Sequence, residues 1–284
     1  MNELSVPGKI PRPIGRWECH KLECFADFIE DYSSSLSASD RYYIDPYAGC
    51  GSCRSKDIHC LVDDSQPRVL KANFTRYIFI ASEPSDAENL KRLTAQGDTA
   101  SQVEIITGSC LSEKVIRQLF DLIPRSASSF ALIDPPGYRR LRWSLVKKLA
   151  SHGSDWQGHK TELLIVFPLE MALLRNLNRP ECEASITRLY GNQEWRQIRQ
   201  DWQEGEIDTT EVRKRLVTLY QTGLKNLGYR YVASLEPAQS PHPPVYLLIW
   251  ASDEANRIKM VADAWNRPRY LPGEMFYRDK QPAQ

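Results

Sequence analysis

The stretch YIDPYAGCG, residues 43–51, decides how the chain is organised. An apolar run ends in Asp45, and Gly49 and Gly51 follow four and six residues later. The aromatic and β-branched residues at 41–45 predict a short strand. The two glycines let the backbone after it come close to a neighbouring group. We therefore expect a strand followed by a loop that either holds a ligand or only turns the chain into a helix.

Four further apolar runs, at 76–84, 103–109, 128–137 and 161–170, follow this loop with helical patterns between them. Strands that alternate with helices at this spacing indicate a parallel, doubly wound sheet. A helix is predicted before the first strand, because Trp17, Leu22, Phe25, Ile29 and Tyr32 share one helical face. We interpret residues 1–40 as an N-terminal helical segment and 41–170 as the α/β core.

The pattern changes after residue 170. Residues 171–228 show helical stretches without a convincing strand, and we interpret them as a helical insert. Two strands at 229–237 and 245–252, joined by a proline-rich loop, predict an antiparallel pair before a helix at 256–266. Residues 229–284 would thus complete the core sheet. Five parallel strands plus such a pair is the Rossmann-like architecture of class I methyltransferases, which depend on S-adenosyl-L-methionine (SAM).

Bulk composition sets limits on the partners. The 284 residues are 42% hydrophobic and 26% charged, with a net charge of +1, as in ordinary globular proteins. Binding to nucleic acid would therefore need a local basic patch. No apolar run approaches the roughly 18 residues of a membrane span, and the polar, proline-rich start lacks the apolar region of a signal peptide. We expect a cytoplasmic protein with no membrane partner.

Seven cysteines, an odd number, favour reduced thiols over a disulfide framework. Cys50 and Cys53 form a CxxC pair, which suggests redox chemistry or half of a zinc site. The only nearby candidates for further ligands are His59 and Cys60, and no second CxxC exists. We expect small buried residues here and no metal.

The glycine loop lacks the third glycine of a dinucleotide-binding GxGxxG motif, because Arg54 stands in its place. This disfavours NAD and FAD. SAM makes other demands, since it carries an ammonium, a sulfonium and a carboxylate but no phosphate. Asp45 at the tip of the first strand suits the cationic end, and Glu83 at the tip of the second can accept the ribose hydroxyls. The alternative is that Asp45 caps the loop and the glycines only permit a turn.

The fourth apolar run ends in Asp134-Pro135-Pro136-Gly137. A planar amino group that receives a methyl group needs an acceptor for its N–H protons and a rigid carbonyl wall. The aspartate supplies the first and the prolines the second, because proline fixes φ and has no N–H. Such positioning is most of what methyl transfer requires. The alternative is that two prolines merely end a strand.

DPYAGCG followed by DPPG resembles the DPFxGSG and (D/N)PP(Y/F/W) motifs of amino-group methyltransferases, including adenine-N6 enzymes of DNA and RNA. Gly137 stands where that group has the aromatic residue that stacks on a flipped base, and Tyr138 comes one residue later as a substitute. Over nearly the whole chain, the order of features resembles the three-Cys-motif partner (TcmP) family. These features include YIDPYAGCGS, FIASEP, ALIDPPG, the segment 189–195 and the late strand–helix VYLLIWASDEANRIKM.

The resemblance implies a SAM-dependent methyltransferase-like protein, and the family name implies association with a cysteine-motif protein of the radical-SAM type. Ser109 stands where methyltransferases often have an acid for the adenine amino group, and it can still accept a hydrogen bond. The expected cofactor-binding residues are Asp45, Pro46, Tyr47, Gly49, Gly51, Glu83 and Ser109. The expected catalytic residues are Asp134, Pro135, Pro136 and Tyr138.

From these features we predict N-methylation of an amino group on a nucleic acid or a modified nucleotide. One alternative is a non-catalytic SAM-binding module that works with the cysteine-motif partner; a weaker one is a nicotinamide-dependent oxidoreductase. Arg139, Arg140 and Arg142 follow the acceptor motif and either contact phosphates or begin a solvated helix. The aromatic residues of the insert, Trp195, Trp202 and Tyr220, fit a hydrophobic core better than base stacking.

Overall fold

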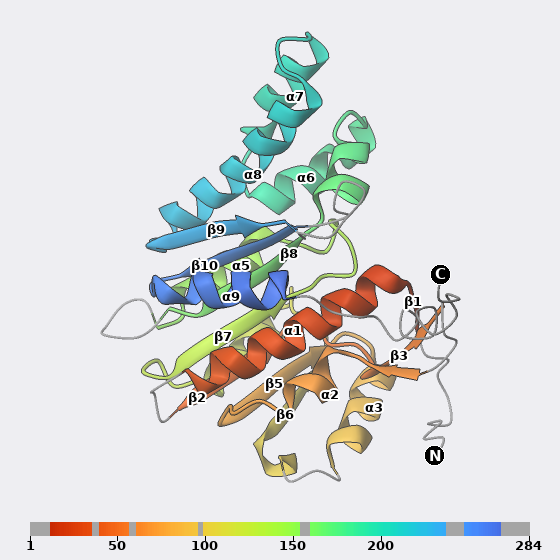
Figure 1. Ribbon diagram of the computed structural model, residues 1–284, viewed down its shortest axis with the longest axis vertical. Coiled ribbons are helices and arrows are strands. Elements are labelled where there is room, and N and C mark those ends of the chain that lie inside the picture. The colour runs from red at the N-terminus through yellow and green to blue at the C-terminus, as the bar shows by residue number, and fades with distance from the viewer. Residues whose placement is uncertain are drawn as a thin grey trace, which may run out of the picture.

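The computed structural model describes residues 12–35, 40–56, 61–95, 99–153, 160–236 and 247–267. A seven-stranded sheet forms its centre, in the order β6-β5-β2-β7-β8-β10-β9 (Figure 1). Five strands run parallel: β2 (Arg41–Asp45), β5 (Arg76–Ala81), β6 (Val103–Thr107), β7 (Ser128–Ile133) and β8 (Glu162–Phe167). The doubly wound, Rossmann-like class expected of a methyltransferase is confirmed.

The last two strands close the sheet in the antiparallel sense. β10 (Leu247–Ser252) lies between β8 and β9 (Tyr231–Leu235) and is antiparallel to both. The predicted antiparallel pair is therefore confirmed, while Val245 and Tyr246 lie outside the described residues. The chain builds β2, β5 and β6 outward in one direction and then returns to place β7 on the other side of β2. This reversal creates a switch point beyond the carboxyl ends of β2 and β7, where open α/β sheets bind ligands.

Alternation along the strands divides the core into two layers. Tyr42 and Ile44 of β2 face a layer formed by α4 (Glu113–Asp121), α5 (Trp143–Ser151) and the insert. Tyr43 faces the other layer, with α1 (Arg16–Ser34), α3 (Pro84–Thr94) and α9 (Asn256–Asn266). Successive side chains of a strand point to opposite faces, so a sheet buried on both sides has continuous apolar runs.

The N-terminal helix α1 covers the middle of the sheet (Figure 1). Of the face predicted for it, Leu22, Phe25, Ile29 and Tyr32 are buried at no more than 3% exposure, while the side chain of Trp17 lies outside the described part of the structure. Phe28 and Tyr32 contact the rings of Phe130 and Trp250 at centroid distances between 5.0 and 6.0 Å. These buried aromatic contacts pack α1 directly against the central sheet, so the helix is part of the hydrophobic core.

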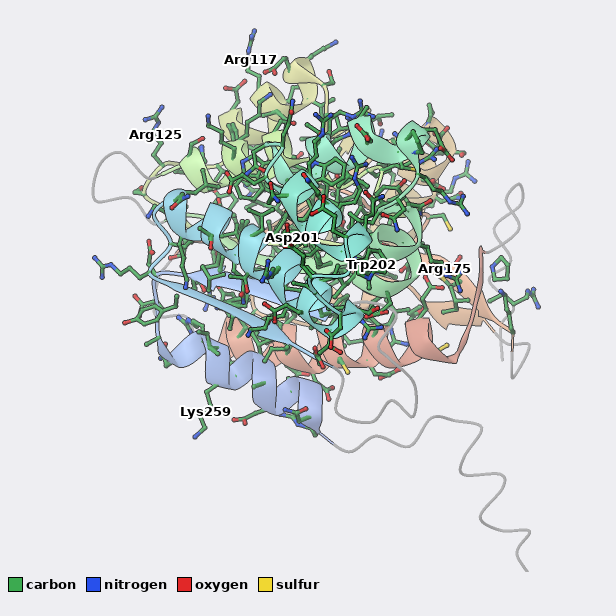
Figure 2. The ribbon with its side chains drawn as sticks, turned by 90° about the horizontal axis from the view of Figure 1, so that it is seen from above. Arg117, Arg125, Arg175, Asp201, Trp202 and Lys259 are labelled. Atoms are coloured by element: carbon green, nitrogen blue, oxygen red, sulfur yellow. The ribbon has the colours of Figure 1, made fainter. Side chains whose placement is uncertain are left out.

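The insert is helical, as predicted. A π-helix, η2 (Leu169–Leu174), and a 3₁₀ turn, η3 (Pro180–Cys182), lead into α6 (Glu183–Tyr190), α7 (Trp195–Gln203) and α8 (Thr209–Asn226). Trp195 and Tyr220 are fully buried, and Trp202 on α7 packs partly buried against the same core (Figure 2). The core interpretation of these aromatic residues is therefore confirmed.

The connection between β2 and β5, a polar stretch of sequence, carries structure that its pattern did not predict. β1 (Arg12–Ile14), β3 (Ser52–Ser55) and β4 (Leu61–Asp63) form a small second sheet, and α2 (Ser65–Val69) follows it. Another 3₁₀ turn, η1 (Ala100–Gln102), precedes β6. The glycine loop thus leads into a strand and not into a helix.

Cys53 is buried beside Ile14 and Leu22 under this small sheet, while Cys50 is half-buried. His59 and Cys60 lie outside the described residues, and within the described ranges no group of three or more His, Cys, Asp or Glu side chains is arranged to hold a metal. No helix in the described part of the chain is long and apolar enough to cross a membrane.

Candidate active site

A cavity lies at the carboxyl edge of the main sheet, at the switch point. It is an open recess, and its volume of about 440 Å³ includes solvent space at its mouth. Its walls come from the segments that follow β2, β5, β6 and β7: Pro46, Tyr47, Ala48, Ile80, Ser82, Ser109, Cys110, Leu111, Pro136 and Arg140. Apolar walls with a few polar groups at the ends of parallel strands are typical of a small-molecule site.

Four of the predicted site residues line this cavity directly: Pro46, Tyr47, Ser109 and Pro136. The other predicted residues follow the same strands but do not line the cavity: Asp45, Gly49, Gly51, Glu83, Asp134, Pro135 and Tyr138. The predicted residues therefore gather at one edge of the sheet, but they do so in two shells.

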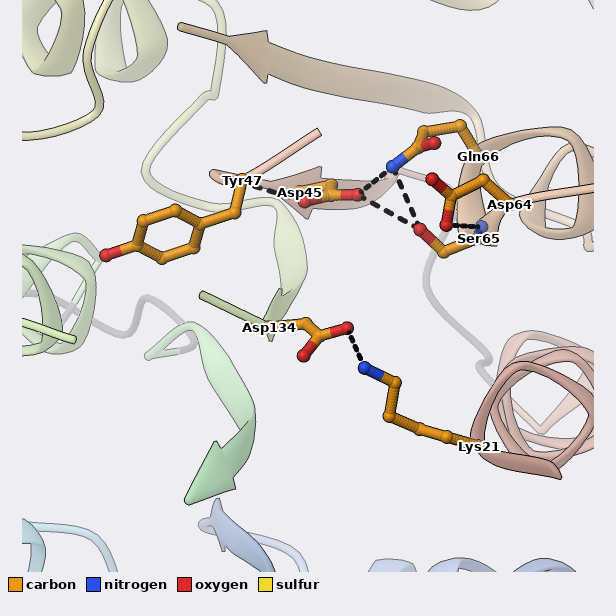
Figure 3. A network of polar contacts seen from close by, with 7 residues as sticks. All are labelled: Lys21, Asp45, Tyr47, Asp64, Ser65, Gln66 and Asp134. Carbon is orange, nitrogen blue, oxygen red and sulfur yellow. Dashed lines mark hydrogen bonds and ion pairs between the residues drawn. The ribbon is translucent and has the colours of Figure 1, made fainter. Parts of the chain in front are cut away.

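Asp45 ends β2 with its carboxylate buried and turned toward α2 (Figure 3). Its Oδ1 accepts a hydrogen bond from the backbone N–H of Tyr47 at 2.9 Å, and its Oδ2 accepts one from Gln66 Nε2 at 2.8 Å. Burial raises the pKa of Asp45 to about 7, and these two hydrogen bonds offset only part of the effect. Asp45 therefore lies outside the cavity wall, and near pH 7 it is only partly ionised.

Negative charge gathers at this corner. Asp64 and Asp134 raise the pKa of Asp45 further, and all three carboxylates add to the effect of burial in raising the pKa of Tyr43. The hydroxyl of Tyr43 is buried and has no hydrogen-bond partner among the described residues. In the described part of this corner, three acids and a single lysine, Lys21, which pairs with Asp134, leave an excess of negative charge that suits a cationic ligand.

Asp134 follows β7 and pairs with a lysine from α1. Lys21 Nζ lies 2.6 Å from Asp134 Oδ2, and the two side chains are 8% and 26% exposed (Figure 3). Lys21 was not among the predicted site residues. Its position in the sequence could have indicated it, because it stands four residues before Phe25, on the apolar stripe of the helix. A lysine in a buried stripe needs a partner, because burial of an unpaired charge is costly.

The cavity wall ties two loops together through Tyr47. Its hydroxyl donates to the backbone carbonyl of Arg140 at 2.6 Å, which links the loop after β2 to the loop after β7. Burial, followed by the neighbouring Cys110, raises the pKa of Tyr47. Burial also raises the pKa of the Cys110 thiol to about 11, so this thiol is neutral and unreactive near pH 7.

Glu83 occupies the tip of β5, one residue after the cavity-lining Ser82. Its side chain is exposed, and none of the described residues pairs with its carboxylate. Ser109 lies across the cavity and accepts a hydrogen bond from the backbone N–H of Leu111 at 3.2 Å. Glu83 therefore has both carboxylate oxygens available beside the cavity.

The two glycines of the loop serve packing. Gly51 has φ +83°, and a Cβ there would lie 2.5 Å from Leu93 Cδ1 on α3. A Cβ on Gly49 would lie 3.1 Å from Asp64 Oδ2. The glycines let the loop approach α3 and the start of α2, and their predicted role toward a cofactor stays a prediction.

The acceptor motif has an unusual backbone. Gly137 takes φ +124°, a conformation that favours glycine, so an aromatic residue at this position would be strained. Its N–H donates to the carbonyl of Pro135 at 2.7 Å. Tyr138 is only 6% exposed, packs in the main core and has its hydroxyl against Arg139. Its ring does not line the cavity, so the structure lends no support to Tyr138 as a substitute stacking residue.

Comparison with known proteins finds likeness of fold. No protein-family model and no curated protein matches the chain. An O-methyltransferase from Bacillus cereus in complex with SAH shares 10% identity at a TM-score of 0.46, covering 80% of this chain and 80% of that chain. Protein LPL1258 from Legionella pneumophila shares 10% identity at 0.47, covering 86% and 92%.

The putative methyltransferase yhhF from Escherichia coli shares 13% identity at a TM-score of 0.35, covering 52% of this chain and 70% of that chain. These TM-scores all lie below 0.5, so they carry nothing about function. The function has to be inferred from the residues of this chain.

Proposed function

We propose that this protein is a SAM-dependent methyltransferase that methylates an amino group on a nucleic acid or a modified nucleotide. The observation that carries the proposal is the cavity at the switch point, beside which Glu83 pairs with none of the described residues and near which Asp45, Asp64 and Asp134 lie. A ligand with a hydroxyl-bearing sugar, a flat apolar ring system and a cationic tail matches each of these features. SAM is such a ligand, and when bound it supplies a methyl group already activated on a sulfonium.

Different residues bind different parts of the cofactor. Ile80 and Leu111 form apolar walls for the adenine ring, with Ser109 as a polar contact at its edge. Glu83 accepts hydrogen bonds from the two ribose hydroxyls. Asp64, and Asp45 in its ionised form, favour the ammonium and sulfonium by charge, since opposite charges attract strongly where water is partly excluded.

Asp134 holds the acceptor. Lys21 contacts Oδ2, and none of the described groups donates to Oδ1, which is free to accept an N–H of the substrate. Pro136 lines the cavity and no described group donates to its carbonyl, whereas the Pro135 carbonyl accepts from the N–H of Gly137. Lys21 fixes the direction of the Asp134 carboxylate. Positioning of this kind aims the nitrogen lone pair at the methyl group, and proximity then lowers the barrier.

Calorimetry with SAM and S-adenosylhomocysteine tests the first half of the proposal. We expect heat of binding with both, and its absence would refute SAM as the cofactor. The second half needs radiolabelled SAM with fractionated cellular RNA, DNA and protein. D134A should abolish label transfer and keep SAM binding, whereas an equal loss of both would place Asp134 in the cofactor site.

One observation favours a second candidate, a non-catalytic SAM-binding module that works with a three-Cys-motif partner protein. Gly137 offers no aromatic ring to a base, and Tyr138 is buried. This candidate predicts a stable complex with the partner in size-exclusion chromatography and no label in any fraction. Label incorporation into any fraction would refute it.

A further inference from the structure

A group of arginines extends from the cavity along the carboxyl edge of the sheet. They come from three segments: the loop after β7, the turns after β8, and α6. Five of the six are exposed and one is half-buried. We call this group the arginine rim: Arg139, Arg140, Arg142, Arg175, Arg179 and Arg188.

Contacts between the segments hold the rim together. Arg139 Nη2 lies 3.7 Å from Cys182 Sγ, which in turn lies 3.5 Å from Asn176 Oδ1. The backbone N–H of Cys182 donates to the carbonyl of Arg179 at 3.0 Å. The loop after β7 therefore lies against the segment that carries Arg175 and Arg179.

The positive charge of Arg142 is repelled by two other members of the rim, Arg140 and Arg188. Burial, together with the charges of Arg188 and Arg140, lowers the pKa of Arg142. The Nε of Arg142 is buried, and no described residue accepts a hydrogen bond from it. Arg140 itself lines the cavity. The rim thus begins at the cavity and reaches α6 with like charges side by side, an arrangement that costs stability unless an anion relieves it.

No described carboxylate neutralises the charge of the rim. Within the described ranges, none of its six members forms an ion pair with a carboxylate. The neighbouring acids are taken by arginines of the insert: Glu170 pairs with Arg213, and Glu183 pairs with Arg196 and Arg199. Glu181 is the exposed acid that stands between Arg179 and Cys182. Other arginines of the insert therefore pair with the nearby acids, and the six rim arginines pair with no carboxylate among the described residues.

We infer that the arginine rim binds the phosphodiester backbone of a nucleic-acid substrate while the target base lies at Asp134. This specifies the acceptor of the proposed function and rests on it, although phosphate binding by the rim can be measured without SAM. The rim contains arginine only, and a guanidinium binds phosphate oxygens in a bidentate, planar fashion that lysine does not match. Phosphate contacts spread over several segments suit a polymer better than a single nucleotide.

Fluorescence anisotropy with labelled 20-nucleotide single-stranded RNA and DNA tests the inference at several salt concentrations. The variant R175Q/R179Q/R188Q removes three rim charges that lie outside the cavity wall. The control K114Q/R117Q/K259Q removes three exposed charges elsewhere; Figure 2 shows Arg117 and Lys259 projecting from other sides of the molecule than Arg175. Thermal unfolding should give both variants the wild-type midpoint.

We expect the rim variant to bind roughly tenfold more weakly, with the slope of log affinity against log salt smaller by about 2. The control should match the wild type. Equal loss in both variants, or unchanged binding in the rim variant, would overturn the inference. Tighter binding to polyglutamate than to either nucleic acid would also overturn it, in favour of an acidic protein. Calorimetry with SAM on the same samples decides the proposed function separately, because the rim variant should bind SAM as the wild type does.

Discussion

Asp45 is the residue at which stability and function oppose each other. Its folded pKa of about 7 lies above the value near 4 expected in the unfolded chain. Between these pH values the folded protein holds a proton that the unfolded chain has lost, so the free energy of unfolding falls as pH rises through this window. The variant D45N should lose this dependence and be more stable above pH 7, by up to about 4 kcal/mol.

Asparagine fits this position, because Gln66 Oε1 is buried without a described partner and can accept from the new amide after a flip. Urea unfolding at pH 4.5, 6 and 8 measures the effect. The same variant should bind SAM more weakly, since it lacks the negative charge behind the cavity. Parallel pH curves for wild type and variant would contradict the raised pKa.

Lys21 is a positioning residue for Asp134, and K21M tests this role. The side chain keeps its length but no longer directs the carboxylate. We expect kcat for methyl transfer to fall about ten- to a hundredfold, because small misplacement of a reacting group is costly. SAM affinity should stay within about twofold of the wild type.

The control for Lys21 is K21R, which restores the charge and should recover part of kcat. A purely structural role would instead lower the thermal midpoint in K21M and leave kcat per folded molecule unchanged. In the double variant K21M/D134N, the loss in kcat should equal that of D134N alone, because both changes act on one pair.

At the scale of elements, the loop between β2 and β3 depends on contact with α3. Gly51 has φ +83° and faces Leu93 and Leu90. G51A should destabilise the fold by about 1–3 kcal/mol through backbone strain and overlap with Leu93. Leu93 is 37% exposed, so L93A alone should cost little. The double variant G51A/L93A should recover the steric part only, and full recovery in urea unfolding would show that the backbone carries no strain.

The same elements show which parts of the fold could be predicted from the sequence. The core strands are buried on both faces and therefore appear in the sequence as continuous apolar runs, whose ends could be predicted. Asp45, Glu83 and Asp134, which follow such runs, do lie at one edge of the sheet. The small sheet under the glycine loop was not predicted, because strands of three or four residues carry too little pattern. Its pairing of β1 with β3 also joins segments about 40 residues apart in sequence.

For the whole molecule, the sequence indicated which residues meet at the edge but not how their side chains turn. The pairing of Lys21 with Asp134 spans 113 residues, and the contact of Gln66 with Asp45 depends on α2. Both follow from how α1 and α2 pack on the sheet, which local pattern does not encode. The arginines after β7 were noted in the sequence, but those after β8 and on α6 were not; that none of the six pairs with a described carboxylate became clear only with the insert in place.

Binding of SAM should therefore stabilise the molecule as a unit, since the cavity wall joins segments that follow four strands of one sheet. At a free SAM concentration of 100 Kd, the free energy of unfolding rises by about 2.7 kcal/mol. For a chain of 284 residues this shifts the thermal midpoint by about 4 °C. Thermal unfolding with SAM, NADH and NADPH at equal concentrations measures the difference. We expect a shift with SAM alone, because the loop lacks the third glycine that a pyrophosphate requires; a shift with a nicotinamide cofactor and none with SAM would reverse the assignment of the cavity.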